Sequence, residues 1–218
     1  MNVLDDETLT EAGLDAAAGQ GRILLIACGA LAREILAVRD ANGWTHLDLA
    51  CLPAKLHNVP QHIPDRVRAR IRRARDEGYG QVFVVYADCG TGGLLDRVCA
   101  EEGVERIPGP HCYSFFDGNE GFTARAEAGE VTAFYLTDFL ARQFETLVWK
   151  GMGLDRHPEL LPMIFGNYEK LVYLAQTDDP ALEAKARAAA ERLGLAYERR
   201  PTGYGDLVPF LAQAAAGR

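Results

Sequence analysis

The stretch VFVVYADCGTGGLLDRV, residues 82–98, contains the pattern that decides the fold of this chain. An apolar run continues to Ala87, a glycine-rich turn follows it, and apolar residues at helical spacing come next. A continuous apolar run is typical of a buried parallel strand, and a turn that leads into a helix begins a crossover connection. This stretch therefore predicts one strand–turn–helix unit of a parallel sheet.

The same unit recurs on both sides of this stretch. RILLIACGA at residues 22–30 and THLDLACLPAKLHNVP at residues 45–60 are further apolar segments, each followed by a helical pattern. VERIPGPHCYSFF at residues 104–116 is consistent with a fourth strand that breaks at Pro108. Strands that alternate with amphipathic helices predict a Rossmann-like α/β fold with a doubly wound, mostly parallel sheet.

The domain organisation has two interpretations at this length. We expect residues 1–20 to form a polar, partly helical arm and residues 21–218 to form a single α/β domain. Two lobes that meet at a cleft, with a change of lobe near residues 120–135, fit equally well. In the second half, AFYLTDFLARQFETLVWKGMGL at residues 133–154 has apolar residues at helix-compatible spacing, which predicts a helix partly capped by Thr137.

The charge balance argues against two classes of partner. The chain has 23 basic and 31 acidic side chains, a formal net charge of -8. Such a surface repels the nucleic-acid backbone and anionic membranes, so we expect neither as a partner. The arginine-rich segment DRVRARIRRAR at residues 65–75 places Val67 and Ile71 on one helix face, which predicts a solvated face for its arginines.

Targeting signals are not evident in the sequence. The first residues are acidic where a secretory leader is basic, and no apolar run reaches the roughly 18 residues that span a bilayer. We therefore expect a cytoplasmic protein whose five cysteines are reduced thiols.

Cysteine side chains follow three of the predicted strands. Cys28 ends the first strand, Cys89 follows the third, and Cys112 follows the fourth. Parallel strands end at the same edge of a sheet, where ligands bind near the topological switch point. His57, in the loop after the second strand, and His111 come to the same edge. We therefore expect a Cys/His site at the carboxyl ends of the strands.

Two metal groups suit such a ligand set. Three thiolates with one imidazole complete a tetrahedral zinc site, and three thiolates also hold an iron–sulfur cluster with one open iron. Zinc is the first expectation, the cluster is the alternative, and the choice between His57 and His111 as fourth ligand stays open. Cys51 and Cys99 are expected to pack as small apolar side chains.

The glycines after the third strand allow two further interpretations. VVYADCGTGG at residues 84–93 resembles the first motif of adenosylmethionine-dependent methyltransferases, although Asp88 stands where that motif has a glycine. Alternatively, the N–H groups of Gly90, Gly92 and Gly93 form a binding site for an anionic group at the start of the next helix.

Acid–base candidates lie in the same part of the chain. Tyr86 and Asp88 stand at the end of the third strand, and His57 lies in the loop after the second. Each residue type can transfer a proton when its pKa is tuned by its surroundings.

Six segments together carry a resemblance to a known family: CGALARE, LPAKLHNVP, VVYADCGTGGLL, GPHCYSFF, FYLTDFLARQFE and FGNYEKLVYLAQT. They resemble an uncharacterised bacterial and archaeal domain-of-unknown-function family over roughly residues 22–208. Members are often encoded beside corrinoid proteins and corrinoid-dependent methyltransferases, which implies one-carbon metabolism and a corrinoid protein as a partner. The positions that match the family's pattern are Cys28, His57, Cys89, His111 and Cys112.

These observations predict a metal-centred enzyme of small-molecule metabolism. The expected reaction is zinc-dependent methyl transfer or hydrolysis, on a small and anionic one-carbon or methyl-carrying substrate. Two alternatives remain open: a non-catalytic accessory protein for a corrinoid methyltransferase system, and an adenosylmethionine-dependent methyltransferase.

Overall fold

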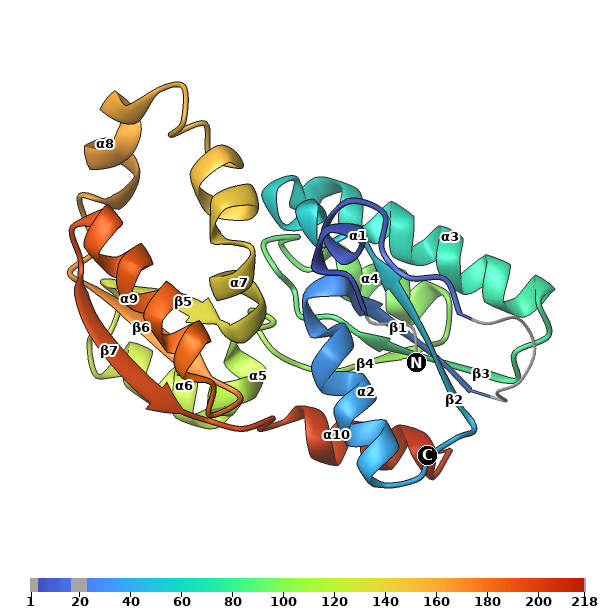
Figure 1. The fold of residues 1–218 in the computed structure, drawn as a ribbon. Helices are drawn as coiled ribbons and strands as arrows, with labels where there is room; N and C mark the ends of the chain where they lie inside the picture. The colour runs from blue at the N-terminus through green and yellow to red at the C-terminus, as the bar shows by residue number, and fades with distance from the viewer. Residues whose placement is uncertain (1–3, 17–22, 218) are drawn as a thin grey trace. The chain divides into compact units, whose positions relative to one another are not determined.

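The computed structural model describes residues 4–16 and 23–217 and contains two parallel β-sheets (Figure 1). The predicted α/β fold with parallel sheets is confirmed. The chain divides into two compact units: unit 1 comprises residues 1–112 and 206–218, and unit 2 comprises residues 113–205. The division falls a few residues before the range expected for a change of lobe.

Sheet A of unit 1 has four parallel strands in the order β2-β1-β3-β4. The strands are β1 (Ile23–Cys28), β2 (Leu47–Leu52), β3 (Gln81–Val85) and β4 (Glu105–Arg106). All six residues of β1 are buried, as a central parallel strand requires. Strand β4 has only two residues, because the proline-rich segment after Ile107 cannot continue the hydrogen-bonding ladder. The chain reverses its direction across the sheet between β1 and β3, which makes this the topological switch point.

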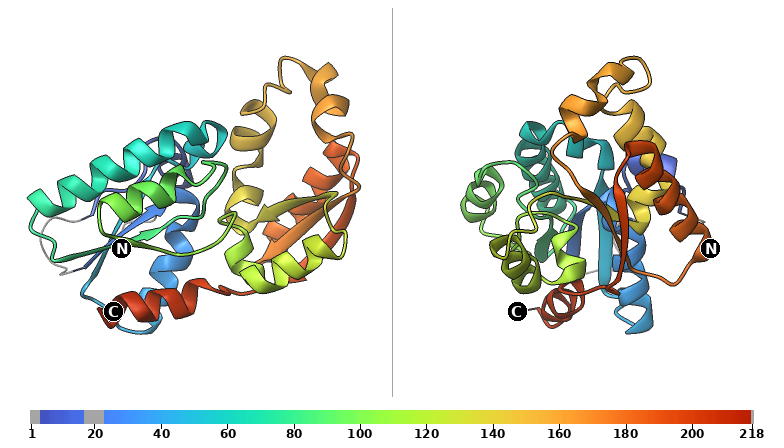
Figure 2. Two further views of the ribbon diagram at one scale, coloured as in Figure 1. Left: turned by 180° about the vertical axis from the view of Figure 1, so that it is seen from behind. Right: turned by 90° about the vertical axis from the view of Figure 1, so that its left-hand side faces the viewer.

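Helices pack on both faces of sheet A (Figures 1 and 2). They are α2 (Ala32–Ala41), α3 (Ile63–Asp76), α4 (Leu94–Glu101) and α10 (Leu207–Ala215), with the short 3-10 turns η1 (Gly29–Leu31), η2 (Ala54–Asn58) and η3 (Pro60–His62). Helices α3 and α4 lie side by side, and α2 and α10 form the other pair. Phe210 of α10 packs edge-on against Phe83 of β3, which ties the end of the chain to sheet A.

The predicted N-terminal arm packs on unit 1 where it is described. Helix α1 (Asp6–Glu11) is capped by Asp5, whose carboxylate accepts from the Thr8 N–H, and it contacts η1 and η2. Leu14 then forms an antiparallel bridge with Cys51 at the outer edge of β2. Residues 1–3 and 17–20 of the predicted arm lie outside the described part of the chain.

Sheet B of unit 2 has three parallel strands in the order β5-β6-β7. They are β5 (Ala133–Thr137), β6 (Lys170–Ala175) and β7 (Ala196–Pro201). The helix predicted from residue 133 onward is wrong in its first five residues, which form β5 and pair with β6. Phe134 and Leu136 fit both a strand and a helix period, so periodicity could not separate the two. Thr137 does cap the following helix, because its hydroxyl accepts from the Leu140 N–H.

The remaining elements of unit 2 cover sheet B. They are α5 (Ser114–Asp117), α6 (Asn119–Glu127), α7 (Asp138–Arg142), α8 (Leu161–Phe165), α9 (Pro180–Leu193), the π-helical segment η4 (Phe144–Lys150) and the 3-10 turn η5 (Pro158–Leu160). Helix α9 packs against α7, β6 and β7 over one apolar core. Phe122 of α6 packs over Tyr135 and Val172 in a second, smaller core on sheet B.

Two surface expectations can be compared with the structure. Several arginines of α3 form ion pairs with acidic residues rather than a free basic surface: Arg68, Arg72 and Arg75 all contact Glu102. No helix in the described residues is both long and apolar enough to cross a bilayer.

Candidate functional site

The candidate site of unit 1 lies at the carboxyl end of sheet A, at the switch point between β1 and β3. Cys28 is the last residue of β1 and pairs in register with Leu52 of β2. Val85, the last residue of β3, is level with Ala27, so Tyr86 follows at the level of Cys28. The rigid centre of the sheet therefore places a thiol and a phenol side by side.

Three cysteines from three strand ends meet here, and we call Cys28, Cys89 and Cys112 the cysteine cluster. The Cys89 Sγ and Cys112 Sγ atoms are 3.2 Å apart. The Cys112 thiol also lies close enough to Cys28 to change the pKa of that thiol. Two backbone hydrogen bonds join the loops that carry Cys89 and Cys112, from Asp88 N–H to Gly109 C=O at 3.0 Å and from Cys89 N–H to Pro110 C=O at 2.9 Å. The predicted role of these cysteines as metal ligands stays a prediction.

The pKa values of Cys28 and Cys112 change in opposite directions. The hydrogen bond from Cys112 lowers the pKa of Cys28 in spite of its burial, with help from the Ala30 N–H and the Tyr86 hydroxyl. The same contacts, to Cys28 first and then to Cys89, raise the pKa of Cys112 well above its ordinary value. Their contact therefore makes Cys28 the more acidic of these two thiols.

Tyr86 contributes a buried hydroxyl that is poorly satisfied. Its side chain is 1% exposed, and its Oη atom has no hydrogen bond of good geometry. The hydroxyl nevertheless lies close enough to Cys28 to lower the pKa of that thiol. Burial first, and then the nearby sulfurs, raise the pKa of Tyr86 well above its ordinary value, so it remains a donor. A buried donor without a good acceptor is uncommon and marks a place where a ligand could bind.

The backbone at Cys89 is in an unfavourable conformation. Its φ angle is +49°, and among the described residues it is the only one other than glycine with a positive φ. The left-handed region brings the Cβ of an L-residue close to its own carbonyl oxygen, at a cost of about 1–2 kcal/mol. Such outliers persist where the surrounding structure holds them, and they concentrate at functional sites.

The glycine-rich turn is already occupied by a carboxylate of the chain itself. Asp88 accepts hydrogen bonds from Thr91 Oγ1 at 2.6 Å, Gly93 N–H at 2.8 Å and Gly92 N–H at 3.1 Å. Burial would raise the pKa of Asp88, but these hydrogen bonds and that of Gly90 prevail and lower it. An external anion could reach these amides only by displacing Asp88. The predicted acid–base role of Asp88 stays a prediction, although its contacts hold it as a structural acceptor.

The two predicted histidines lie close to each other. Burial lowers the pKa of His111, the charge of His57 lowers it further, and Asp88 opposes this change. The imidazole of His57 keeps solvent contact, yet desolvation by the surrounding atoms lowers its pKa too. Both rings are therefore predominantly neutral near pH 7, which suits a ligand or a general base.

The described residues contain no group of three or more His, Cys, Asp or Glu side chains that is arranged to hold a metal ion. The other two cysteines are buried, as expected for packing. Burial, and then the nearby Cys28, raise the pKa of Cys51 well above its ordinary value. Burial raises the pKa of Cys99 on α4 to about 11.

A cavity of about 620 Å³ lies elsewhere in unit 1, between α3, β2 and the segment after α1. Most of the charged side chains that line it are paired: Lys55 with Glu11, Arg73 with Asp15, and Arg70 with Glu77. Cys51 lines this cavity, but the cysteine cluster does not. The cavity therefore does not mark the candidate site.

Unit 2 contains a buried polar network that the sequence did not indicate. Asp138, at the first position of α7, is 1% exposed. Its carboxylate accepts from Thr177 Oγ1 at 2.5 Å, Tyr173 Oη at 2.7 Å, Thr177 N–H at 3.1 Å and Gln176 N–H at 3.2 Å. Gln176 also accepts from the Asp138 N–H at 2.7 Å. These contacts join the end of β5 to the end of β6.

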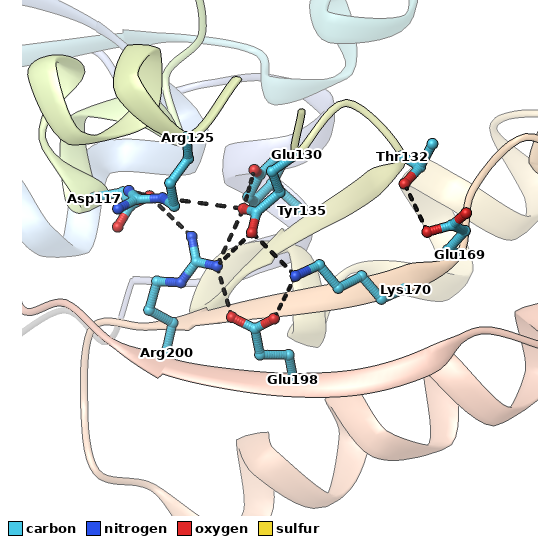
Figure 3. A network of polar contacts seen from close by, with 9 residues as sticks. All are labelled: Asp117, Arg125, Glu130, Thr132, Tyr135, Glu169, Lys170, Glu198 and Arg200. Atoms are coloured by element: carbon cyan, nitrogen blue, oxygen red, sulfur yellow. Dashed lines mark hydrogen bonds and ion pairs between the residues drawn. The ribbon is translucent and has the colours of Figure 1, made fainter. Parts of the chain in front are cut away.

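A second network of unit 2 is built from charges (Figure 3). The ionisable side chains that its dashed lines connect are Asp117, Arg125, Glu130, Tyr135, Lys170, Glu198 and Arg200. Glu169, drawn beside them, accepts from Thr132 instead. Glu130 accepts from Tyr135 Oη at 2.8 Å, Lys170 Nζ at 3.0 Å and Arg200 Nη2 at 3.1 Å. Burial would raise the pKa of Glu130, but these partners lower it to about 2. Three acidic and three basic side chains balance one another, so the network leaves no net charge for a ligand.

Comparison with known proteins identifies the family of the chain. A family described as "Protein of unknown function (DUF1638)" matches residues 51–211, which include three of the four β-strand ends around the site. No curated protein and no solved structure matches the chain with significance. Since the match extends over well more than half of the sequence, the chain belongs to the DUF1638 family.

Proposed function

We propose that the cysteine cluster is a thiolate zinc centre and that the protein is an enzyme that acts there on a small molecule. The observation that supports this proposal is the position of Cys112, whose thiol contacts both Cys28 and Cys89 at the switch point of sheet A. Sulfurs from the end of β1 and from the loops after β3 and β4 would hold the ion and leave a fourth position for a histidine or a substrate.

The three cysteines are not arranged around an ion in this structure, so zinc would have to draw them into place. With Zn–S bonds of about 2.3 Å, two sulfurs on one tetrahedral ion lie about 3.8 Å apart. Cys89 Sγ and Cys112 Sγ, now 3.2 Å apart, would have to separate by about half an ångström, which side-chain rotation can provide. Proton loss from Cys112 would remove the hydrogen bonds that now draw the sulfurs together.

The neighbouring groups suit chemistry at the open position. Bound zinc lowers the pKa of a thiol or water and so supplies a nucleophile at neutral pH. Tyr86 would donate its unsatisfied hydroxyl to a sulfur or to the bound substrate. His57 or His111, each with a lowered pKa, would serve as fourth ligand or accept a proton. Zinc–thiolate chemistry of this kind suits methyl transfer to a thiol, or hydrolysis of a methylated small molecule.

An adenosylmethionine site is less well supported. In that interpretation, the glycine-rich turn would approach the methyl donor closely, but Asp88 fills the turn with its own carboxylate. Equilibrium dialysis with adenosylmethionine separates the two proposals, because the zinc proposal predicts no binding to the metal-free protein. We also infer a cytoplasmic location, since reduced thiols persist there.

Metal content tests the proposal directly. The full chain is purified anaerobically without chelator, and its zinc, iron and sulfide contents are measured together with its visible spectrum. We expect about one zinc per chain, lost in each of Cys28→Ser, Cys89→Ser and Cys112→Ser. Cys99→Ser is the matched control, because Cys99 is a buried thiol of α4 outside the cluster.

Three outcomes decide between the interpretations. Zinc that depends on the three cluster cysteines and not on Cys99 supports the proposal. Iron with sulfide and a broad visible band would mean that the cysteine cluster holds an iron–sulfur cluster instead of zinc. Protein that neither contains metal nor takes up added zinc or cobalt would overturn the proposal of a metal centre.

A further inference from the structure

We propose that Cys89 and Cys112 are a redox pair that forms a reversible intramolecular disulfide with a low-molecular-weight disulfide as oxidant. Their sulfurs are 3.2 Å apart. A disulfide bond is about 2.05 Å long, so the two atoms have to approach by about 1.1 Å. This inference goes beyond the zinc proposal and does not depend on it.

The backbone favours this pair over the other combinations. The hydrogen bonds Asp88–Gly109 and Cys89–Pro110 hold the two loops against each other next to the sulfurs. Cys28, in contrast, is the last residue of the central strand β1 and pairs in register with Leu52 of β2. The thiol pair therefore lies on two joined loops, whereas the third thiol belongs to the rigid sheet.

Solvent access indicates which sulfur reacts first. Cys28 is 6% exposed and Cys89 is 8% exposed, whereas Cys112 is only half-buried. Cys112 is therefore the most exposed residue of the three, and we assign it the first attack.

The reaction balances in two exchange steps. Cys112 Sγ attacks one sulfur of the oxidant, and the first small thiolate leaves and takes up the Cys112 proton. Cys89 Sγ then attacks Cys112 Sγ, displaces the second small thiolate, and gives its proton to it. Two protein S–H groups and one small disulfide become one protein disulfide and two small thiols. The protein loses two electrons and the oxidant gains them.

Disulfide formation would also remove two sulfurs from the zinc centre. Oxidised protein therefore cannot hold a metal through Cys89 and Cys112, and bound zinc should protect both thiols. This consequence links the two proposals, although each is tested by its own measurement.

Peptide mapping of the metal-free full chain tests the pair. Chelator-treated protein is equilibrated anaerobically with mixtures of reduced and oxidised glutathione, quenched at low pH, alkylated and digested with trypsin. Cleavage after Arg97 and Arg106 places Cys89, Cys99 and Cys112 on separate peptides. We expect two of the five thiols to be lost and a peptide linked through Cys89 and Cys112, with the other three cysteines alkylated.

Variants distinguish the pair from its neighbours. Cys28→Ser should still form the same link, because Cys28 is not a member of the pair. Cys99→Ser should behave like the unaltered chain. A link that involves Cys28, or glutathione that stays on Cys112 without an intramolecular link, would overturn the proposal. Since the chelator-treated protein carries no metal, a failure to form the disulfide is distinct from a failure to find zinc.

Discussion

The carboxyl ends of the two parallel sheets both gather buried polar side chains, but they satisfy them differently. At the end of sheet B, the carboxylate of Asp138 accepts four hydrogen bonds from Tyr173, Gln176 and Thr177. At the end of sheet A, two sulfurs lie 3.2 Å apart and the buried hydroxyl of Tyr86 has no good acceptor. The same place in two α/β units therefore holds a complete network in one and an incomplete one in the other.

This difference separates a structural network from a candidate site. A buried network with every group satisfied rigidifies the fold, and removing any member leaves a group unpaired. A cluster with an unsatisfied buried donor and a strained backbone angle contributes less to stability than an equally buried cluster without them. Unit 2 should therefore lose stability when its strand-end residues change, and unit 1 should lose function instead.

Asp138→Ala is expected to have the largest effect on stability. It leaves the Tyr173 hydroxyl and the Gln176 and Thr177 amides buried without an acceptor, so we expect unit 2 to be destabilised by about 3–5 kcal/mol. Each unit has one tryptophan, Trp44 in unit 1 and Trp149 in unit 2. Urea unfolding followed by Trp149 fluorescence in a Trp44→Phe background therefore reports unit 2.

Asp178→Ala is the control for that measurement. Asp178 pairs with Arg199 at 2.8 Å, but its side chain is 99% exposed, so its removal should change the unfolding midpoint little. Equal effects of the two substitutions would mean that the Asp138 network adds nothing beyond a surface ion pair.

Glu130→Gln is expected to destabilise unit 2 by about 2 kcal/mol at pH 7, because a partly buried carboxylate loses its charge beside Lys170 and Arg200. The folded-state pKa of Glu130, about 2, lies below its ordinary value of 4.5. Its stabilising contribution is therefore complete above pH 4.5 and is lost as the pH falls toward 2. The unfolding midpoints of the unaltered chain and of Glu130→Gln should therefore converge as the pH falls from 4.5 toward 2.

A matched control exists for this pH dependence. Glu145 and Arg192 form an ion pair of 2.6 Å in the same unit, but both side chains are more than 40% exposed. Glu145→Gln should change stability by less than about 1 kcal/mol. A Glu130 effect that persists unchanged at pH 2 would show that it does not arise from the charge.

Two tyrosine-to-phenylalanine substitutions test the comparison most directly. Tyr173 and Tyr86 are each 1% exposed, and both stand at or near the end of a strand. Tyr173→Phe removes a hydrogen bond to the Asp138 carboxylate and should destabilise unit 2 by about 1.5 kcal/mol. Tyr86→Phe removes a hydroxyl without a good acceptor and should leave unit 1 unchanged or slightly more stable.

The two substitutions are measured in proteins that keep one tryptophan each. Trp44 fluorescence reports the unfolding of unit 1 in Tyr86→Phe, and Trp149 fluorescence reports unit 2 in Tyr173→Phe. If both variants lose a similar amount of stability, the Tyr86 hydroxyl is as well hydrogen-bonded as that of Tyr173. The distinction between the two strand ends would then fail. Zinc content should survive in Tyr86→Phe, since the phenol is not a proposed ligand.

Sequence reasoning reached the strand ends of unit 1 because β1 and most of β3 are short apolar runs. The position of Cys28 and Cys89 after such runs was therefore predictable, as was the helix after Gly93. Strand β5 was missed because Phe134 and Leu136 fit both periods, and Asp138 was consequently placed inside a helix rather than after a strand.

Other features depend on contacts between distant residues. The charged network of Figure 3 draws on residues from α5, α6 and all three strands of sheet B, with no spacing that unites them. The occupation of the glycine-rich turn by Asp88 depends on positive φ angles at residues 89, 90, 92 and 93. No pattern in the sequence indicated that Cys89 itself adopts this conformation.

The smallest expected effect concerns this conformation of Cys89. Cys89→Gly relieves the strain of a φ angle of +49° but adds chain entropy to the unfolded state, whereas Cys89→Ser keeps the strain. We expect unit 1 to be more stable in Cys89→Gly than in Cys89→Ser by about 1 kcal/mol, measured through Trp44 fluorescence. Both variants remove the thiol, so both should lose zinc and the disulfide. If unit 1 is more stable in Cys89→Ser than in Cys89→Gly, the backbone at Cys89 is relaxed. The strand end of unit 1 would then lack one of the features that set it apart from unit 2.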